Sequence, residues 1–323
     1  MADDFETIDV ELPPLHDGDV RRRTIYLSLD PYMRGRMDDA PSYAASVGLD
    51  EVMVGRTVAE VLESKHPDLV RGDFVASNDG WQSHGQSAGS QLQKLDASRA
   101  PISYALGVLG MPGLTAYAGL LDIGQPKPGE TVVVSAAAGA VGSIVGQIAR
   151  IKGCRTVGVA GGPAKCDYVV RELGFDACVD HRAEHLTKNL ASACPNGIDV
   201  YFDNVGGAVL DAVFRLINQN ARIPLCGLIA DYNAVEKARG PNLRPLLVKR
   251  AMIKGFIVTD YANRAAACFE DLAAWLNDGS LKYREDVVEG LDAAPSAFLK
   301  LFDGTNLGKL LVRVSPDPTR PTA

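Results

Sequence analysis

The sequence predicts an α/β protein that combines a doubly wound parallel sheet with a second, β-rich domain. The chain has 323 residues, more than one core usually organises, so two domains are expected. Residues 1–105 contain short alternating stretches broken by Gly, Pro and Asp, which are typical of strands. From "LGMPGLTAYAGLLDIG" onward helical and strand patterns alternate, which is typical of a parallel sheet covered by helices.

In the first domain, the stretches "YLSLDPYMRG", "GRTVAEVLES" and "GDFVASNDGW" predict strands of a barrel-like structure. The densest basic cluster is "VRRRT", near residue 20. An apolar strand pattern follows it, which indicates an exposed strand start rather than a nucleic-acid-binding patch. The tail "GKLLVRV" is strand-like and is expected to return to this domain. We therefore assign residues 1–105 and 285–323 to the first domain.

Residues 106–284 are expected to form the domain that contains the parallel sheet. Six strands are predicted near residues 131, 155, 177, 198, 222 and 254, and an amphipathic helix from about Arg264 to Leu276. In open α/β sheets, ligands bind beyond the carboxyl ends of the strands. "DVYFDNVGG" and "ARIPLCGLIADYN" contain the fourth and fifth strands with their exit loops. These two loops are therefore expected to lie at a ligand site.

The first strand of this domain leads into a turn of small residues. Thr131 to Ser135 is apolar and β-branched, and helical periodicity begins at Val141. Ala136, Gly139 and Gly142 lie three residues apart, a relaxed form of the glycine fingerprint that binds a dinucleotide pyrophosphate at a helix N-terminus. Tight packing of the helix on the sheet would require the same glycines. The strand that follows the helix is therefore needed to distinguish dinucleotide binding from packing.

The second strand of the unit ends in Ala160, Gly161 and Gly162, and Lys165 follows three residues later. A cofactor without a 2′-phosphate needs an acidic residue here to bind its ribose hydroxyls, and this segment contains none. The pattern therefore favours NADP(H) over NAD(H). The alternative interpretation makes Lys165 an ordinary solvated charge at the start of the next helix.

Composition limits the remaining classes of function. The 33 basic and 40 acidic residues give a net charge of −7, and no long block of like charges suggests a nucleic-acid or membrane partner. No apolar run reaches about 18 residues, and the acidic N-terminus is unlike a signal peptide, so a soluble cytoplasmic protein is expected.

The cysteines argue against a bound metal. They are residues 154, 166, 178, 194, 226 and 268, with no CxxC pair and no tight cluster, so we interpret them as reduced thiols. The first 153 residues, where a zinc alcohol dehydrogenase has its ligands, contain no cysteine. We therefore predict chemistry without a metal ion.

Five segments together resemble one family. They are "YLSLDPYMRGRM" (26–37), "GMPGLTAYAGL" (110–120), "AAAGAVGSIVGQIA" (136–149), "YFDNVGG" (201–207) and "NLGKLLV" (306–312). They look like the zinc-independent medium-chain dehydrogenases/reductases, and within these like the group of leukotriene B4 12-hydroxydehydrogenases, prostaglandin reductases, alkenal double-bond reductases and curcumin reductases. The resemblance spans nearly the whole chain, and "LSLDPYMRGRM" is more specific than the glycine turn.

This resemblance implies a GroES-like catalytic domain, a Rossmann domain and a homodimer. It also implies NADPH-dependent reduction of the carbon–carbon double bond of α,β-unsaturated ketones or aldehydes. The cofactor-binding residues that it implies are Ala138, Gly139, Ala140, Val141, Gly162, Lys165, His181, Asn204, Cys226, Gly227, Leu228, Ile229, Ala230, Asp231, Tyr232, Phe256, Ile257, Val258 and Asn306. His181 departs from the tyrosine that is common in the family, but histidine can still donate to a phosphate, and Arg182 is adjacent.

Such a reaction needs a hydrogen-bond donor at the carbonyl oxygen, where an enolate forms when hydride reaches the β-carbon. The candidate catalytic residues are Tyr232 and Tyr32, acting directly or through a ribose hydroxyl while solvent protonates the α-carbon. The alternative is that Tyr232 only packs the cofactor and that Tyr32 is a structural residue in the bend after Pro31.

Two other functions remain open from the sequence. A quinone oxidoreductase of the zeta-crystallin type has the same two-domain plan without zinc, although "LSLDPYMRGRM" argues against it. A non-catalytic NADPH-binding protein would keep the glycine turn and Lys165 but would need no tyrosine at the nicotinamide. The presence of both candidate tyrosines favours an enzyme.

Overall fold

The computed structural model describes residues 2–234 and 240–320. Over this part of the chain it divides into two compact units. Unit 1 comprises Met1–Gly107 and Glu285–Ala323, and unit 2 comprises Val108–Arg284. The boundary expected from the sequence lies two residues earlier, after residue 105. Unit 2 is thus inserted between two segments that fold together as unit 1.

Unit 1 is built on a sheet of seven strands among the described residues, in the order β12-β13-β1-β2-β3-β5, with β4 also pairing with β1. The strands are β1 (Asp19–Ser28), β2 (Thr57–Ser64), β3 (Phe74–Ser77), β4 (His84–Ala88), β5 (Gln93–Leu95), β12 (Glu285–Glu289) and β13 (Lys309–Arg313). Two α-helices, α1 (Tyr32–Gly35) and α9 (Ala294–Asp303), complete the described regular elements, apart from short 3-10 turns. The strands predicted in "YLSLDPYMRG", "GRTVAEVLES" and "GDFVASNDGW" are confirmed as β1, β2 and β3.

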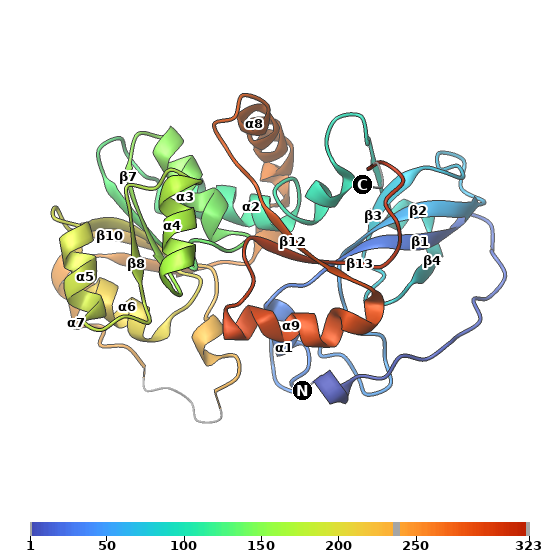
Figure 1. Ribbon diagram of the computed structural model, residues 1–323, viewed down its shortest axis with the longest axis horizontal. Helices are drawn as coiled ribbons and strands as arrows, with labels where there is room; N and C mark the ends of the chain where they lie inside the picture. Colours follow the sequence, from blue (N-terminus) through green and yellow to red (C-terminus); the bar gives the residue numbers. More distant parts are fainter. Residues whose placement is uncertain (1, 235–239, 321–323) are drawn as a thin grey trace. The chain divides into compact units, whose positions relative to one another are not determined.

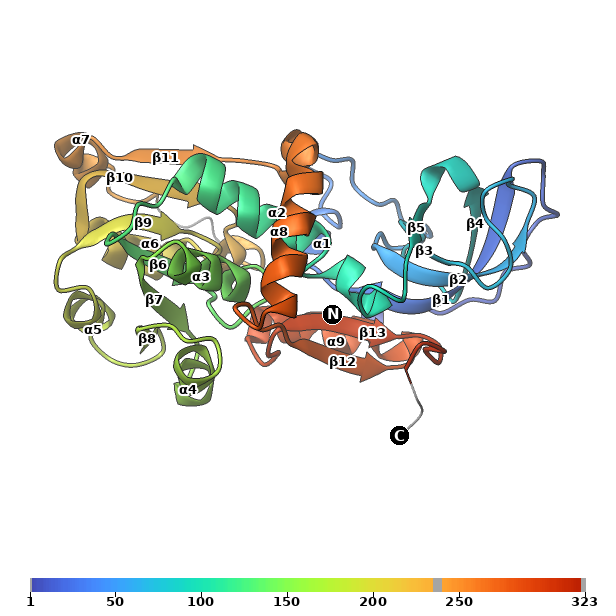
Figure 2. The same cartoon turned by 90° about the horizontal axis from the view of Figure 1, so that it is seen from above.

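The tail "GKLLVRV" forms β13 and returns to unit 1, as predicted. It pairs antiparallel with β1 at Tyr26–Ser28 and parallel with β12 (Figure 2). The other half of β1, Asp19–Arg23, pairs with β4 along the same strand. Strand β1 is therefore central, and its pairing is complete only when the C-terminal segment is in place.

The expected exposed strand start at "VRRRT" is only partly correct. The Arg22 side chain is fully buried and forms an ion pair with Asp79, which is itself 8% exposed. Its Nη1 also donates to the Val20 carbonyl at 2.7 Å. Arg21 and Arg23, on either side, are only partly buried and bind glutamates. Alternation along the strand thus directs Arg22 inward, where Asp79 balances its charge.

A second buried ion pair joins two of the motifs noted in the sequence. Lys309, the first residue of β13, donates from Nζ to Asp30 Oδ1 at 2.6 Å and to the Leu29 carbonyl at 2.9 Å. The Ser28 hydroxyl donates to the other oxygen of Asp30. The Lys309 and Asp30 side chains are 1% and 7% exposed. This pair fixes the segment between β1 and α1, where Tyr32 begins the helix.

Unit 2 contains a parallel sheet of six strands among the described residues, in the order β11-β10-β9-β6-β7-β8. The strands are β6 (Thr131–Ser135), β7 (Arg155–Ala160), β8 (Ala177–Asp180), β9 (Ile198–Phe202), β10 (Ile217–Leu225) and β11 (Met252–Gly255). All six lie where they were predicted. This order is that of a doubly wound Rossmann sheet (Figures 1 and 2), which confirms the predicted fold class.

Helices cover the sheet of unit 2. The described α-helices are α2 (Met111–Ala118), α3 (Gly142–Ile151), α4 (Pro163–Arg171), α5 (Leu186–Ala193), α6 (Gly207–Phe214), α7 (Arg244–Lys249) and α8 (Ala265–Asn277). α8 confirms the amphipathic helix predicted from about Arg264 to Leu276. A large core joins the strands to α5 and α6 through buried aliphatic and aromatic residues, among them Leu190, Leu210 and Phe214. α3 buries Ile144, Val145 and Ile148 and packs on β6 and β7.

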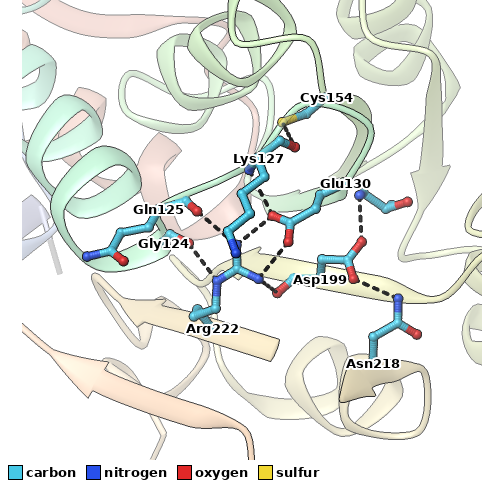
Figure 3. Close-up of polar contacts among 9 residues, drawn as sticks. Gly124, Gln125, Lys127, Glu130, Cys154, Asp199, Asn218 and Arg222 are labelled. Atoms are coloured by element: carbon cyan, nitrogen blue, oxygen red, sulfur yellow. Dashed lines mark hydrogen bonds and ion pairs between the residues drawn. The ribbon is translucent and has the colours of Figure 1, made fainter. Parts of the chain in front are cut away.

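A polar network lies at the amino ends of the strands, opposite the edge where ligands bind in such sheets. Figure 3 shows Arg222 of β10 donating to the Gly124 and Gln125 carbonyls, each at 2.9 Å, and to Glu130 Oε1 at 3.0 Å. Asp199 of β9 accepts from the Thr131 N–H at 2.8 Å. These contacts tie β6, β9 and β10 together at one end, so the network is structural.

Replacing Glu130 by glutamine should make the protein less sensitive to acid. Burial favours a neutral carboxyl, but hydrogen bonds from Arg222 and from the Lys127 N–H hold the pKa of Glu130 below its usual value. A depressed folded-state pKa stabilises the fold above the unfolded pKa, and that contribution is lost as the pH falls through the folded pKa. Glu130→Gln should therefore lower the free energy of unfolding by about 1–2 kcal/mol at pH 7, and the difference from the native protein should shrink as the pH falls below the ordinary pKa of glutamate and vanish below the lowered pKa of Glu130.

Urea denaturation at a series of pH values from 7 down into the acid range would measure this difference. Glu289→Gln is a matched control, because Glu289 forms an ion pair with Arg313 but its side chain is 63% exposed. The control should change the free energy of unfolding little at any pH. A Glu130→Gln effect that stayed constant down to the lowest pH at which the protein is folded would contradict the prediction.

Candidate functional site

The turn after β6 has the strained geometry that small residues allow. Ala136 has a φ of +50°, and its carbonyl accepts from the Gly139 N–H at 2.9 Å. A Cβ atom on Gly142 would lie 2.4 Å from the same carbonyl oxygen. Gly142 is therefore explained by the packing of α3 on the turn. α3 begins after Val141 without a side-chain cap, so the positive end of its dipole suits an anion.

The loop after β7 is held by a carboxylate that sequence reasoning missed. Gly162 has a φ of +91°, and its N–H donates to Asp180 Oδ1 at 2.8 Å. The same oxygen accepts from the Arg182 N–H at 2.9 Å. These two hydrogen bonds lower the pKa of Asp180. As noted from the sequence, the segment itself contains no acidic residue, but Asp180 arrives from β8 and binds the loop backbone.

Basic side chains gather at the same corner, which we call the cationic corner: Lys165, His181 and Arg182. A Cβ atom on Gly161 would lie 3.1 Å from both His181 Nε2 and Arg182 Nε, so a residue without a side chain lets these groups approach the loop. Partial burial and the charges of Arg182 and Lys165 lower the pKa of His181. Three groups that can donate to a phosphate therefore lie at the end of β7, where a dinucleotide carries its adenosine ribose.

The loop after β9 is organised by Asp203, which is fully buried. Its Oδ1 accepts from the Tyr201 hydroxyl at 2.8 Å and from the N–H groups of Val205 and Gly206 at 2.9 Å. Next to it, Asn204 donates from its side chain to the Ser135 carbonyl at 2.8 Å. Asn204 therefore lies at the carboxyl ends of both β6 and β9, where ligands bind in sheets of this order.

The segment Cys226–Tyr232 lies against this loop. The Cys226 N–H donates to the Asp203 carbonyl at 2.8 Å, and the Ile229 N–H donates to the Asn204 carbonyl at 3.4 Å. Burial and the neighbouring Asp203 raise the pKa of the Cys226 thiol to about 12. The Tyr232 hydroxyl would lie 3.4 Å from a Cβ atom on Gly227, so the missing side chain leaves space beside the phenol.

Residues 256–258 follow β11 at the same edge of the sheet. The Phe256 ring contacts Phe202 and Tyr261 edge to face, with centroids 6.2 and 5.9 Å apart. A Cβ atom on Gly119 would lie 2.6 Å from Phe256 and 2.7 Å from Phe202. Phe256, Ile257 and Val258 are all half-buried. Unit 2 thus brings the predicted residues from the ends of β6, β7, β8, β9, β10 and β11 to one edge of its sheet.

Two of the predicted site residues belong to unit 1 instead. Burial and the nearby Asp30 raise the pKa of Tyr32, so its phenol stays a neutral donor. The Asn306 side chain donates to the Gly308 carbonyl at 3.2 Å and is 9% exposed. Met33 is fully buried in the core around Leu27 and Phe298. The roles of Tyr32 and Asn306 remain predictions.

Comparisons with known proteins bear on this site. Residues 1–95 match the family described as the N-terminal domain of oxidoreductase, and residues 140–277 match the family described as zinc-binding dehydrogenase. The chain is 51% identical over 319 residues to the NADPH-dependent curcumin reductase of Escherichia coli, covering 97% of this chain and 92% of that protein. The chain belongs to the medium-chain dehydrogenases/reductases, in the prostaglandin, curcumin and alkenal reductase group.

Other similar proteins match most of their length. Prostaglandin reductase 1 of Oryctolagus cuniculus is 42% identical over 314 residues, covering 95% of this chain and 87% of that protein. The crystal structure of CurA from Vibrio vulnificus in complex with NADPH is 50% identical with a TM-score of 0.92, covering 96% of this chain and 94% of that one. An Escherichia coli quinone oxidoreductase complexed with NADPH has a TM-score of 0.75 at 18% identity, which shows the shared fold alone.

Two further properties concern the described residues. Within residues 2–234 and 240–320, no three His, Cys, Asp or Glu side chains are grouped so that they could hold a metal ion. In the same part of the chain, every helix is too short or too polar to cross a membrane.

Proposed function

We propose that the chain reduces the carbon–carbon double bond of α,β-unsaturated ketones and aldehydes with NADPH, in the cytoplasm. The observation that carries the proposal is the 51% identity over 97% of the chain to an NADPH-dependent curcumin reductase. A 2-alkenal reductase (NADP(+)-dependent) from Nicotiana tabacum, 42% identical over 96% of the chain, supports the same reaction.

The residues of unit 2 fit NADPH. The turn Ala138 to Val141, which leads into the uncapped start of α3, suits the pyrophosphate, because helix N-termini bind anions. The cationic corner suits the 2′-phosphate, and Asp180 is already bound to the loop backbone. Asn204, the segment Cys226–Tyr232 and residues 256–258 would then hold the remainder of the cofactor.

When bound, NADPH supplies the hydride that adds to the substrate β-carbon. The protein has to stabilise the negative charge that then develops on the carbonyl oxygen. We assign this role to the Tyr232 hydroxyl, with Tyr32 as a second neutral donor, and the α-carbon proton to solvent. Each tyrosine donates a hydrogen bond without losing its proton.

An absorbance assay tests the proposal. NADPH consumption would be followed with a panel of alkenals and enones, with a quinone, and with an alcohol plus NADP⁺ in the reverse direction. Consumption that depends on an enone supports the proposal. Preference for the quinone would identify a quinone oxidoreductase, and tight NADPH binding without any turnover would identify a non-catalytic NADPH-binding protein.

Lys165→Ala should weaken NADPH binding roughly tenfold, because a hydrogen bond to a charged group is worth about 1.5–3 kcal/mol. NADH binding should not change, because NADH lacks the 2′-phosphate. Fluorescence titration with both cofactors would measure the two effects. Lys188→Ala, at an exposed position of α5, is the control and should leave both affinities unchanged. Equal losses for NADPH and NADH would show that Lys165 does not bind the 2′-phosphate.

We also propose that the protein is a homodimer that pairs through β11. This strand is the edge of the Rossmann sheet, and all four of its residues are exposed. Exposed aliphatic side chains surround it: Leu243, Leu247, Val248, Met252 and Ile253. Parallel sheets are normally covered, and exposed apolar edges favour association. A second copy of the chain would cover this surface.

Ile253→Lys should convert the dimer to a monomer in light-scattering measurements, because it places a charge in the apolar surface. Leu49→Lys, at a residue 96% exposed in unit 1, is the control and should leave the mass unchanged. A native protein that is monomeric at micromolar concentration would overturn the dimer proposal.

A further inference from the structure

Two cysteines that lie apart in the sequence meet beside the cationic corner. Cys166 lies in the first turn of α4, and Cys178 is the second residue of β8. The Cys178 thiol donates to Cys166 Sγ across 2.7 Å. A disulfide joins its sulfurs at about 2 Å, so the two atoms need to move by less than 1 Å to form one. Helix α4 and strand β8 lie side by side (Figure 1).

The surroundings make this pair chemically different from the other four cysteines. Cys154, Cys194 and Cys268 are buried. Cys226 is half-buried like Cys166 and Cys178, but burial and Asp203 raise the pKa of its thiol to about 12. The hydrogen bond from Cys178 lowers the pKa of the Cys166 thiol, against the effect of burial. The same contact and burial raise the pKa of Cys178. Cys166 is therefore the group that attacks an oxidant, and Cys178 is the group that resolves the product.

The pair is connected to the cationic corner through the backbone. Lys165 immediately precedes Cys166, and the Cys166 N–H donates to the Gly162 carbonyl at 3.3 Å. Asp180, which holds the loop through the Gly162 N–H, follows Cys178 by two residues. A covalent bond between α4 and β8 would therefore fix both elements that carry the basic side chains.

We propose that Cys166 and Cys178 form a redox-modification site for hydroperoxides, whose oxidation to a disulfide tightens the binding of the cofactor 2′-phosphate. The Cys166 thiolate attacks one oxygen of hydrogen peroxide, which gives a sulfenic acid and releases water once protonated. The Cys178 sulfur then attacks the Cys166 sulfur, and a second water leaves. Two thiols and one peroxide thus give one disulfide and two waters, and the peroxide is the oxidant.

Two physical reasons lead us to expect tighter NADPH binding after oxidation: a change in charge and a loss of conformational freedom. The thiolate form of Cys166 places a negative charge near the cationic corner, and oxidation to the disulfide removes that charge, so a phosphate dianion meets less repulsion after oxidation. The disulfide also restricts α4 and β8 in an arrangement close to the one they already have. This coupling rests on the proposed function, because it takes the cationic corner as the 2′-phosphate site. By linkage, bound NADPH should make the disulfide harder to reduce by the same factor.

The test begins with the full-length protein exposed to limiting hydrogen peroxide, then alkylated and mapped as peptides without reductant. A Cys166–Cys178 cross-link is expected, with the other four thiols still alkylated. Cys166→Ser and Cys178→Ser should each abolish it, and Cys268→Ala should retain it. Absence of this cross-link, or preferential linkage of other cysteines, would overturn the redox site whether or not the protein reduces enones.

Cofactor titration of the reduced and oxidised forms tests the coupling. We expect NADPH to bind at least twofold more tightly to the oxidised form and NADH to bind equally to both, with no difference in Cys166→Ser. Weaker NADPH binding after oxidation, or equal changes for both cofactors, would overturn the coupling. NADPH binding by the reduced protein without enone turnover would refute the proposed function alone. The peptide cross-link and the cofactor titration do not depend on turnover.

Discussion

Lys309→Met should lower the free energy of unfolding of unit 1 by about 3–5 kcal/mol, as expected when one partner of a buried ion pair is removed. Asp30 would keep its charge in a site that is 7% exposed, with only the Ser28 hydroxyl still donating to it among the contacts described. The Leu29 carbonyl would also lose its bond from Nζ. The large cost comes from the carboxylate left without its cation, because methionine fills most of the volume of the lysine stem.

Urea denaturation followed by tryptophan fluorescence would measure this loss. Trp81 stacks on Phe5 in unit 1, and the other tryptophan, Trp275, lies in unit 2, so a Trp275→Phe background makes the signal specific to unit 1. Lys94→Met is the matched control, because Lys94 binds Asp73 at 2.7 Å but its side chain is 53% exposed. The control should cost at most about 1 kcal/mol. Equal losses for the two variants would mean that burial adds nothing to the Asp30–Lys309 pair.

Replacing both Asp30 and Lys309 separates the effect of charge on stability from the effect of packing. Asp30→Asn together with Lys309→Met removes the uncompensated charge and should recover much of the stability lost in Lys309→Met alone. The double variant also bears on Tyr32, which begins α1 two residues after Asp30. The ion pair holds the segment that leads to Tyr32. If Tyr32 contributes to catalysis, the double variant should therefore have a lower kcat than the native protein even when it is stably folded.

Tyr232→Phe should lower kcat for an enone by about tenfold or more, as found when a donor to a developing oxyanion is removed. The phenyl ring keeps the packing beside Gly227 and removes only the hydroxyl. NADPH affinity should therefore stay nearly constant, so the loss should appear in kcat and not in binding. Initial rates with one enone, together with a fluorescence titration of NADPH, would give both quantities.

Tyr168→Phe is a suitable control, because Tyr168 lies on α4 next to Arg284 and has no part in the proposed reaction. Tyr32→Phe is the competing variant. An unchanged kcat for Tyr232→Phe with a large loss for Tyr32→Phe would assign the donor to unit 1. Full activity in both variants would leave Tyr232 and Tyr32 as packing residues and require another donor.

The Rossmann sheet was predictable because its strands alternate with helical patterns, and β6, β7 and β9 are short runs rich in β-branched residues. The periodicity of such runs is local, so the six strands and α8 were found where the sequence placed them. β12 and α9 were not predicted as elements. In β12, Glu289 is exposed and the other four residues are only partly buried. Its sequence "EDVVE" therefore lacks a clear apolar face. Its place is set by parallel pairing with β13.

For the site, too, local sequence patterns could reveal only part of the arrangement. The glycine turn and Lys165 are local features and could be found by spacing. Asp180 could not, because it reaches the loop of Gly162 from a strand 18 residues away. The cysteines were interpreted as showing no tight cluster, yet the fold places two of them, 12 residues apart, in contact. Pairs of this kind depend on which strands become neighbours, and single-sequence patterns do not contain that information.

The late pairing of β1 has a consequence for how the chain is made. A ribosome completes residues 108–284 before β13 emerges, so the Rossmann unit can fold while Tyr26–Ser28 still lack their partner strand. Throughout this period the central strand of unit 1, β1, presents an open edge, the kind of surface that promotes aggregation. A nascent chain would need protection there until release. A message that stopped before Lys309 would yield a finished nucleotide-binding domain joined to a sheet that cannot close.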